Sequence, residues 1–383
     1  MSFLFTENSF AYETKNKLQS GAGAWSGVKK ELEWRADEHM TRGPWSVTYD
    51  KSPAASGNPH DYFSEGPYWW PNPENPDGPY IRRDGEFNPN VFQAHLSGLS
   101  AMSKTVLLLA QAGFYLDESR YSERAVLLLK TWFLDEKTKM NPHFEYAQAI
   151  RGRCDGRGIG IIDAKAFIPV VYAAGFLEES GGWEAELSAL KAWFAEFLHW
   201  MNTSKKGLDE KHYFNNHANW WNTQAATYAA FTGNLALFDE CVERFRTVII
   251  PEQTDAEGHF IDELTRTRAY TYSLFNLEAT ALMCELAYTY RGVDLWHFET
   301  PDGKGIGKCL EFMKPYYENL FDWQYKQISM PESTGDKYAY QLAALRLDRP
   351  DYARINRARA ENLYRIRHAS PLGALALQPG FVM

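Results

Sequence analysis

From about residue 96 onward, apolar residues recur at helical spacing along almost the whole chain. Leu96, Leu99 and Val106 fall on one helical face, and Gly181 and Gly233 stand between such stretches of roughly 12 to 20 residues. Few segments alternate as strands would. The pattern predicts an all-α fold of antiparallel helical hairpins. The amphipathic stretches are residues 96–110, 125–132, 164–178, 183–201, 220–232, 235–248, 272–290, 306–320, 337–347 and 351–366.

With one or two helices between residues 10 and 40, the chain is expected to form about eleven to thirteen helices. No fixed-period repeat is present, which disfavours an irregular solenoid relative to a closed or nearly closed ring of helix pairs. A length of 383 residues allows one large domain or two, but no shift in composition marks a linker. We therefore predict one domain over residues 1–383.

Two regions, residues 43–90 and 140–163, break the helical rhythm. An unstructured segment as long as the first is usually functional or disordered inside a compact domain. It contains Tyr68, Trp69 and Trp70, in a chain with 13 Trp and 22 Tyr, and such rings are common in sugar-binding clefts. We expect this long loop region to fold onto the helices and to be functional.

Charge and cysteine content limit the partners. The net charge of −9 argues against a broad basic face for nucleic acid or anionic lipid. Four cysteines without CxxC spacing indicate free thiols. Charged residues interrupt the first 18 residues, so no signal peptide is predicted, and no later run of about 18 apolar residues is expected to span a membrane. We expect a cytoplasmic protein, or a secreted or periplasmic one if a leader has been removed, and either a monomer or a homodimer.

Asn216 and His217 stand where a predicted loop runs into a helix, and Arg266, Arg268 and Tyr272 follow about fifty residues later. In a purely structural interpretation, Asn216 caps the helix, His217 packs in its first turn, and the later block is a basic surface helix. Spacing four apart would instead place Arg268 and Tyr272 on one helical face.

Together these side chains suit β-elimination from a uronic acid. Removing the proton beside the sugar carboxylate requires that the carboxylate charge be neutralised, and Asn216, His217 and Arg266 could donate to it. A neighbouring guanidinium should lower the pKa of Tyr272, which could then accept a proton and return one to the leaving oxygen. This chemistry needs no metal and no cofactor.

The motifs Asn216-His217 ahead of Trp220-Trp221, and Arg266-x-Arg268-Ala269-x-x-Tyr272, resemble those of the alginate lyase superfamily. The loop segments 60–71, 77–85 and 141–158 are also similar, and the resemblance covers about residues 43–330. It is strongest to polysaccharide lyase family 38 and more distant to family 5. The spacing from Arg266 to Tyr272 is one residue shorter than in family 5, and Ser273 stands where that family often has histidine, which leaves Arg266 and Arg268 partly exchangeable.

The resemblance implies an (α/α) toroid of about six or seven helical hairpins, with the loop region over an open groove. It further implies a polysaccharide lyase that binds an acidic polysaccharide or oligosaccharide and cleaves 1,4-linked polyuronates, glucuronan and/or alginate, leaving 4,5-unsaturated uronate ends. Tyr272, His217, Asn216 and Arg266 are the expected catalytic residues. For a proton and leaving oxygen on the same side of the ring, Tyr272 could make both transfers. For opposite sides, His217 would be the base and Tyr272 the acid. The sequence leaves this choice, and endo or exo action, open.

A second set of residues is predicted to bind substrate, although each could equally brace the loop region. No catalytic metal is expected, because the scattered histidines lack ligand spacing. The motif His60-Asp61-Tyr62 receives no role. The predicted substrate-binding residues are Arg268, Gln148, Arg157, Tyr68, Trp69, Trp70, Arg82 and Trp220.

Two alternatives remain. An inverting glycoside hydrolase on a helical toroid would use a carboxylate pair drawn from Asp61, Asp155, Asp163 or Glu263. A non-catalytic binder of acidic glycans would keep the fold and lose turnover. The presence of all four catalytic residue types at the expected separations weighs against the binder.

Overall fold

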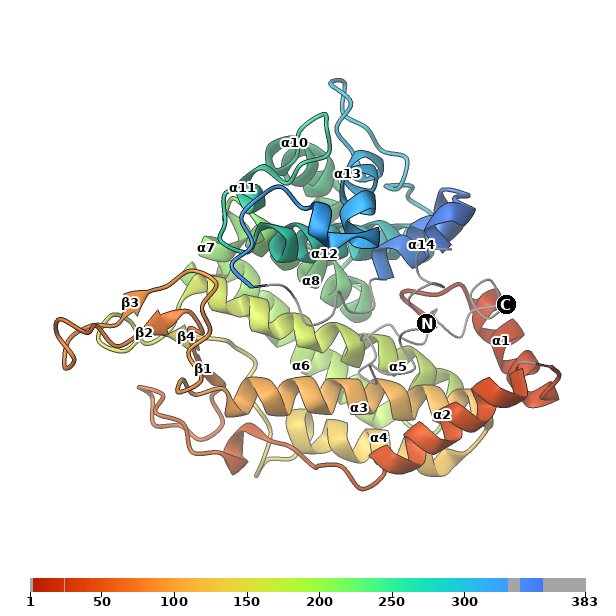
Figure 1. Cartoon of the computed structure of the whole chain (residues 1–383). Coiled ribbons are helices and arrows are strands. Elements are labelled where there is room, and N and C mark those ends of the chain that lie inside the picture. Colours follow the sequence, from red (N-terminus) through yellow and green to blue (C-terminus); the bar gives the residue numbers. More distant parts are fainter. Residues whose placement is uncertain (1–2, 24, 330–337, 354–383) are drawn as a thin grey trace.

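The computed structural model describes residues 3–353, except residue 24 and residues 330–337, and it is built almost entirely of helices (Figure 1). The predicted segment 351–366 therefore lies largely outside the described residues. The described helices are α1 (Asn8–Ser20), α2 (Trp25–His39), α3 (Ala94–Leu116), α4 (Ser119–Leu129), α5 (Ile168–Ser180), α6 (Glu184–Thr203), α7 (Lys205–Lys211), α8 (Asn216–Thr232), α9 (Leu235–Arg244), α10 (Ile250–Gln253), α11 (Ile261–Leu264), α12 (Ala269–Arg291), α13 (Ile306–Glu318) and α14 (Tyr338–Arg346).

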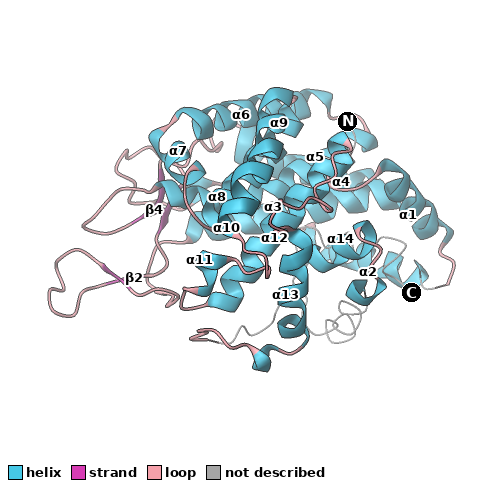
Figure 2. Ribbon diagram, turned by 90° about the horizontal axis from the view of Figure 1, so that it is seen from above, coloured by secondary structure: helices cyan, strands magenta, loops and turns pink. Residues whose placement is uncertain are grey.

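Five helices, α3, α5, α8, α12 and α14, form an inner row in which each packs against the next. Helices α5, α8 and α12 are buried along most of their length. Helix α5 is apolar on nearly every face, whereas α8 and α12 also bury polar side chains such as Asn219 and Asn276, which bond to each other at 2.7 Å. Helices α4, α6, α9 and α13 cover this row from outside, and each contacts an inner neighbour (Figure 2). The predicted arrangement of antiparallel helix pairs is thus observed.

The N-terminal segment of the described chain contacts both α3 and α14, the first and last helices of the row. Arg346 of α14 bonds to Glu7, just before α1, at 2.7 Å and to the buried Glu285 of α12 at 2.7 and 3.0 Å. Phe3 packs against Phe114 with ring centroids 5.3 Å apart. These contacts bring the N-terminal segment against the inner helices at both ends of the row.

The predicted loop region is more ordered than expected. It contains β1 (Phe63–Glu65), which pairs in parallel with β4 (Tyr146–Ala149), and the antiparallel hairpin of β2 (Trp69–Trp70) and β3 (Ile81–Arg82). The hairpin projects from one side of the helical body, beside the N-terminal ends of α8 and α12 (Figure 1). The second irregular region, residues 140–163, supplies β4 and the start of a 3₁₀ helix, Gly158–Phe167.

Two long helical segments are strongly apolar. Helix Ala94–Leu116 and the continuous helical segment Gly158–Ser180 are long and apolar enough, by composition, to cross a membrane. However, 72% and 83% of their most apolar windows are buried inside the protein, as in the core helices of a helical domain. The prediction of one domain over residues 1–383 stays a prediction.

Candidate active site

His217 occupies the first turn of α8. The helix begins here because the side chain of Asn215 accepts a hydrogen bond from the backbone N–H of His217 at 3.2 Å, so the cap is Asn215 rather than the expected Asn216. The imidazole Nδ1 lies 3.0 Å from Oε1 of Glu210, a fully buried residue on α7. The side chain of His217 keeps 16% of its surface exposed, so Glu210 orients a ring that can still be approached.

The imidazole of His217 is neutral at ordinary pH. Burial lowers its pKa to about 3, and the positive charges of Arg157, Arg266 and Arg82 act in the same direction. Burial also raises the pKa of the Glu210 carboxyl. A neutral imidazole held by one nitrogen can act as a proton acceptor or a hydrogen-bond donor.

Asn216 is tied to a buried carboxylate. Its backbone N–H and its side-chain Nδ2 both donate to Oε1 of Glu263, at 2.8 and 2.6 Å. Glu263 lies on α11 with 1% of its surface exposed, and burial raises its pKa although the bonds from Asn216 oppose the shift. Its other oxygen, Oε2, is 3.8 Å from Nη1 of Arg266, so Glu263 connects the two predicted donors.

Arg266 is held by Asp84, a residue of the loop region 182 positions away. Nη2 donates to Oδ1 at 2.8 Å and Nε to Oδ2 at 3.1 Å, so the contact is bidentate. Burial alone would raise the pKa of Asp84, but the Arg266 and Thr267 hydrogen bonds hold it well below its usual range. Arg82 adds another bond, from Nη2 to Oδ1 of Asp84 at 2.7 Å.

Tyr272 lies in the first turn of α12, under the guanidinium of Arg266, which is 4.0 Å from the centre of the phenol ring. Tyr272 is 9% exposed, and among the residues that the structure describes its hydroxyl has no hydrogen-bond partner of good geometry. Burial raises the pKa of Tyr272, and the nearby Tyr68 hydroxyl adds to the rise. Arg266 lowers this pKa as expected, but the predicted net decrease is wrong because burial outweighs the guanidinium.

The four predicted catalytic residues therefore lie in one cluster. Asn216 bonds to Glu263, Glu263 approaches Arg266, and Arg266 lies over Tyr272. Arg266 is also close enough to His217 to depress its pKa. A neutral acceptor, a cation and a phenol are thus assembled around one location beside the hairpin.

Arg268, the predicted alternative to Arg266, contacts other residues. Its Nη2 donates to Ser329 at 2.6 Å, and its guanidinium lies 5.4 Å from the ring centre of Phe87. Arg266 is therefore the arginine that contacts Tyr272.

Gln148 and Arg157 brace each other rather than facing open space. Arg157 donates to the Gln148 side chain at 2.7 Å and to its backbone carbonyl at 3.0 Å. Gln148 also donates to the buried Asp163 at 3.1 Å and is held at φ 50°, an uncommon conformation for a residue other than glycine. The network fixes Arg157 near His217, and Gln148 keeps only 9% of its surface exposed.

The hairpin aromatics are partly exposed and stacked with arginines. Arg153 lies 5.1 Å from the ring centre of Trp69, and Arg83 lies 5.1 Å from that of Trp70. Arg82 is 53% exposed beyond its contact with Asp84. By contrast, Trp220 is 4% exposed and packs against Phe275, so almost none of its ring is available for the predicted contact with substrate.

The motif His60-Asp61-Tyr62 has a structural role. His60 contacts the carbonyl of Lys139 at 2.6 Å, and Tyr62 donates to Asp163 at 3.1 Å. Asp61 accepts a bond from Asn141 at 2.7 Å. Asp61, Asp163 and Glu263, three of the carboxylates considered for a hydrolase, are thus buried and hydrogen-bonded.

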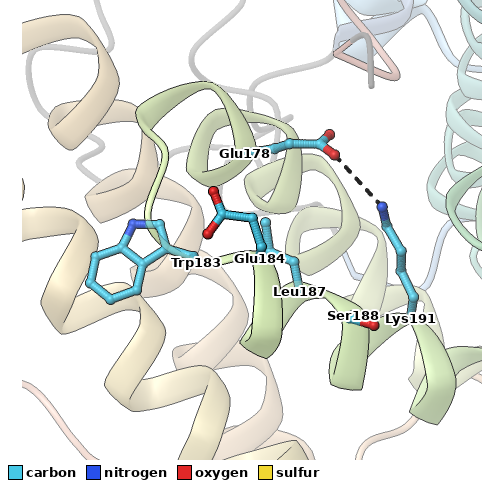
Figure 3. Close-up of a pocket in the computed structure, with 6 residues that line it drawn as sticks. All are labelled: Glu178, Trp183, Glu184, Leu187, Ser188 and Lys191. Atoms are coloured by element: carbon cyan, nitrogen blue, oxygen red, sulfur yellow. Dashed lines mark ion pairs between the residues drawn. The ribbon is translucent and has the colours of Figure 1, made fainter.

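Two other features lie outside this cluster. A surface pocket of ≈ 190 Å³ is lined by residues of α5 and α6 and their connection, including Trp183 and the ion pair of Glu178 and Lys191 (Figure 3). Asp255, Glu257 and His259 have ligand atoms within 4.8 Å of one another, a geometry that a metal could use, although His259 already bonds to Asp255 at 2.7 Å.

Sequence reasoning missed the roles of Asp84 and Glu210. Asp84 lies in one of the motifs quoted above, but the sequence does not indicate that it pairs with Arg266, which is 182 positions away. Glu210 lies seven residues before His217, across a loop, and no spacing rule predicts that the two side chains will be in contact.

Known proteins resemble this chain in sequence and in fold. A family model described as alginate lyase matches residues 46–323. An alginate lyase structure from Bacteroides ovatus is 32% identical, covers 98% of both chains and superposes with a TM-score of 0.88. Alginate lyase A1-III from Sphingomonas species A1 is 14% identical, with a TM-score of 0.58 over 96% of this chain and 93% of that one.

A variant of the latter enzyme, complexed with a tetrasaccharide, is 16% identical, with a TM-score of 0.56 over 87% of this chain and 84% of that one. Its likeness extends to the fold alone. No curated protein sequence matches the chain.

Proposed function

This chain belongs to the alginate lyase family and is a polysaccharide lyase with an (α/α)-toroid fold, and from that premise we propose that it cleaves alginate by β-elimination. The products are chains with 4,5-unsaturated uronate ends. Glucuronan, which shares the 1,4-linked uronate backbone, is the second substrate of the proposal. Within the superfamily, motif spacing favours polysaccharide lyase family 38.

The observation that supports this reaction best is the stacking of Arg266 on Tyr272 at 4.0 Å, with Asn216 and His217 beside them. In the proposal, Arg266 and Asn216 neutralise the sugar carboxylate, which stabilises the charge that develops when the adjacent proton leaves. Tyr272 donates a proton to the departing oxygen. A guanidinium held in place in a partly buried site stabilises negative charge more strongly than one in water.

The base depends on the sugar. Mannuronate and glucuronate have the same configuration at C4 and C5, so the proton and the leaving oxygen lie on one side, and Tyr272 makes both transfers. Guluronate is inverted at C5, and His217 then takes the proton from the opposite side. The protonation states without substrate support the guluronate route directly. That route needs a neutral imidazole as base and a protonated phenol as acid, and both are present. The first route requires that Tyr272 lose its proton on substrate binding.

The proposed reaction is independent of metal. The guanidinium of Arg266, together with the amide of Asn216, supplies the charge stabilisation that a cation would otherwise provide. The proposal therefore assigns no ligand role to the Asp255 group.

A substrate panel tests the proposal. Polymannuronate, polyguluronate, glucuronan and hyaluronan are each incubated with the protein, and ultraviolet absorbance of the conjugated double bond is followed together with new reducing ends. We expect both signals with at least one alginate polymer. New reducing ends without the absorbance would indicate hydrolysis, and neither signal with any polymer would reject the proposed reaction.

A further inference from the structure

We propose that Asp84 is a positioning residue for the elimination, which holds Arg266 flat on the ring of Tyr272 so that the outer N–H groups of the guanidinium meet the sugar carboxylate. The inference rests on the proposed function, because it assigns the use of Arg266 in that reaction. Asp84 acts through Arg266 and touches no reacting atom.

All three oxygen atoms of Asp84 accept hydrogen bonds from residues 266–267. Its carboxylate receives Nη2 and Nε of Arg266 at 2.8 and 3.1 Å, and the backbone N–H and hydroxyl of Thr267 at 3.3 and 2.9 Å. Its backbone carbonyl receives the same hydroxyl at 2.7 Å. Five hydrogen bonds therefore join this residue to residues 266–267.

The backbone next to Asp84 is shaped for this contact. Gly85 has φ 78°, which L side chains rarely adopt, and an added Cβ would lie 2.6 Å from the hydroxyl of Thr267 and 2.8 Å from Cγ of Arg268. The loop thus comes as close to this segment as backbone without a side chain permits. Such a fit fixes Asp84 relative to Arg266 rather than leaving a chance surface ion pair.

The geometry leaves Arg266 able to bind a second anion. A guanidinium has five N–H donors, and Asp84 accepts one from Nη2 and one from Nε. The remaining donors are on Nη1 and the outer side of Nη2, where Nη1 lies 3.8 Å from Glu263. A two-point contact fixes the plane of the guanidinium, which a single contact would not.

Arg82 joins the same carboxylate from the exposed side. It donates to Oδ1 of Asp84 at 2.7 Å and remains 53% exposed. Asp84 therefore connects the hairpin to Arg266 and balances part of the positive charge that the two arginines would otherwise place side by side.

Kinetics of Asp84→Asn and Asp84→Glu test the proposal. A misplacement of about 1 Å at a charge-stabilising group costs up to about a hundredfold in rate, so we expect kcat of Asp84→Asn to fall by about 10- to 100-fold with a smaller change in KM. Asp84→Glu keeps the carboxylate and should recover part of the loss. The control is Glu86→Gln, which removes the same charge from the same loop, where the carboxylate is 53% exposed and 3.9 Å from Arg83. We expect wild-type kinetics from it.

Wild-type kcat in Asp84→Asn, an equal fall in Glu86→Gln, or no recovery in Asp84→Glu would each overturn the inference. Hydrogen exchange tests the role of Asp84 separately from the proposed function, because the measurement needs no substrate. Amides of residues 82–88 and 265–268 should exchange faster in Asp84→Asn than in wild type or Glu86→Gln. Unchanged exchange would show that Asp84 does not hold this segment, whatever polymer the protein acts on.

Discussion

Replacing Tyr272 with phenylalanine should leave the protein at least as stable as wild type while nearly abolishing turnover. The hydroxyl is buried, and among the described residues it has no hydrogen-bond partner of good geometry. A buried polar group without a partner costs about 1–3 kcal/mol, so its removal should raise the free energy of unfolding by up to about that amount. The phenyl ring remains, and with it the packing against Arg266 at 4.0 Å.

The rate should respond in the opposite direction. The proposal makes this hydroxyl the acid for every substrate, and proton transfer by a positioned side chain typically contributes about 10²–10⁴ in rate. We therefore expect kcat to fall by at least about a hundredfold, with a modest change in KM. Initial rates from ultraviolet absorbance and unfolding by denaturant measure the two effects on the same preparation.

Tyr228→Phe is the matched control. Tyr228 is a fully buried tyrosine on α8 whose hydroxyl donates to the carbonyl of Ala164 at 2.7 Å. Removing this hydroxyl breaks a buried hydrogen bond, so the variant should lose about 0.5–1.5 kcal/mol of stability and keep its kcat. The reasoning is refuted if Tyr272→Phe turns over at the wild-type rate, or if it is destabilised as much as Tyr228→Phe.

Four further predictions concern His217 and metal. His217→Ala should reduce cleavage of polyguluronate far more than cleavage of polymannuronate, and an equal loss on both polymers would contradict the two-route assignment. Because burial lowers the pKa of His217 to about 3, kcat/KM should show no acid limb near pH 6.5, where an ordinary imidazole titrates, and a limb there in wild type that is absent in His217→Ala would contradict the assignment. The same shift predicts that stability decreases as pH falls below about 6.5, where the unfolded imidazole binds a proton and the folded one does not, and that His217→Gln weakens this dependence. A chelator should leave the rate unchanged, and a loss restored by added divalent cation would reject metal independence.

The helices were largely predictable because each buries a face or a whole surface with regular spacing. The stretch 272–290 corresponds to α12, Ala269–Arg291, and 183–201 to α6, Glu184–Thr203. The predicted helix boundaries were less accurate where a capping side chain, rather than the apolar spacing, sets the end of the helix. Helix α8 begins at Asn216, four residues before the predicted stretch, because the cap is formed by Asn215.

The cluster itself was only partly predictable. Residue types and motif resemblance named Asn216, His217, Arg266 and Tyr272, but not the carboxylates that hold them. Glu210 and Asp84 act through contacts that exist only after helices have packed and the loop has folded back. The direction of the Tyr272 pKa was wrong for the same reason, since the neighbouring charge could be guessed from the sequence and the extent of burial could not.

The bond from Arg346 to Glu7 has a consequence for folding kinetics. The two residues are 339 positions apart, and the same arginine engages Glu285, so one side chain of α14 fastens the segment before α1 to α12. Contacts this distant in sequence form slowly, because a long loop must close before they are made. We expect this contact to form late in refolding, after α1 and α2 have packed against α3, so Arg346→Ala should speed unfolding in denaturant while it leaves the refolding rate nearly unchanged.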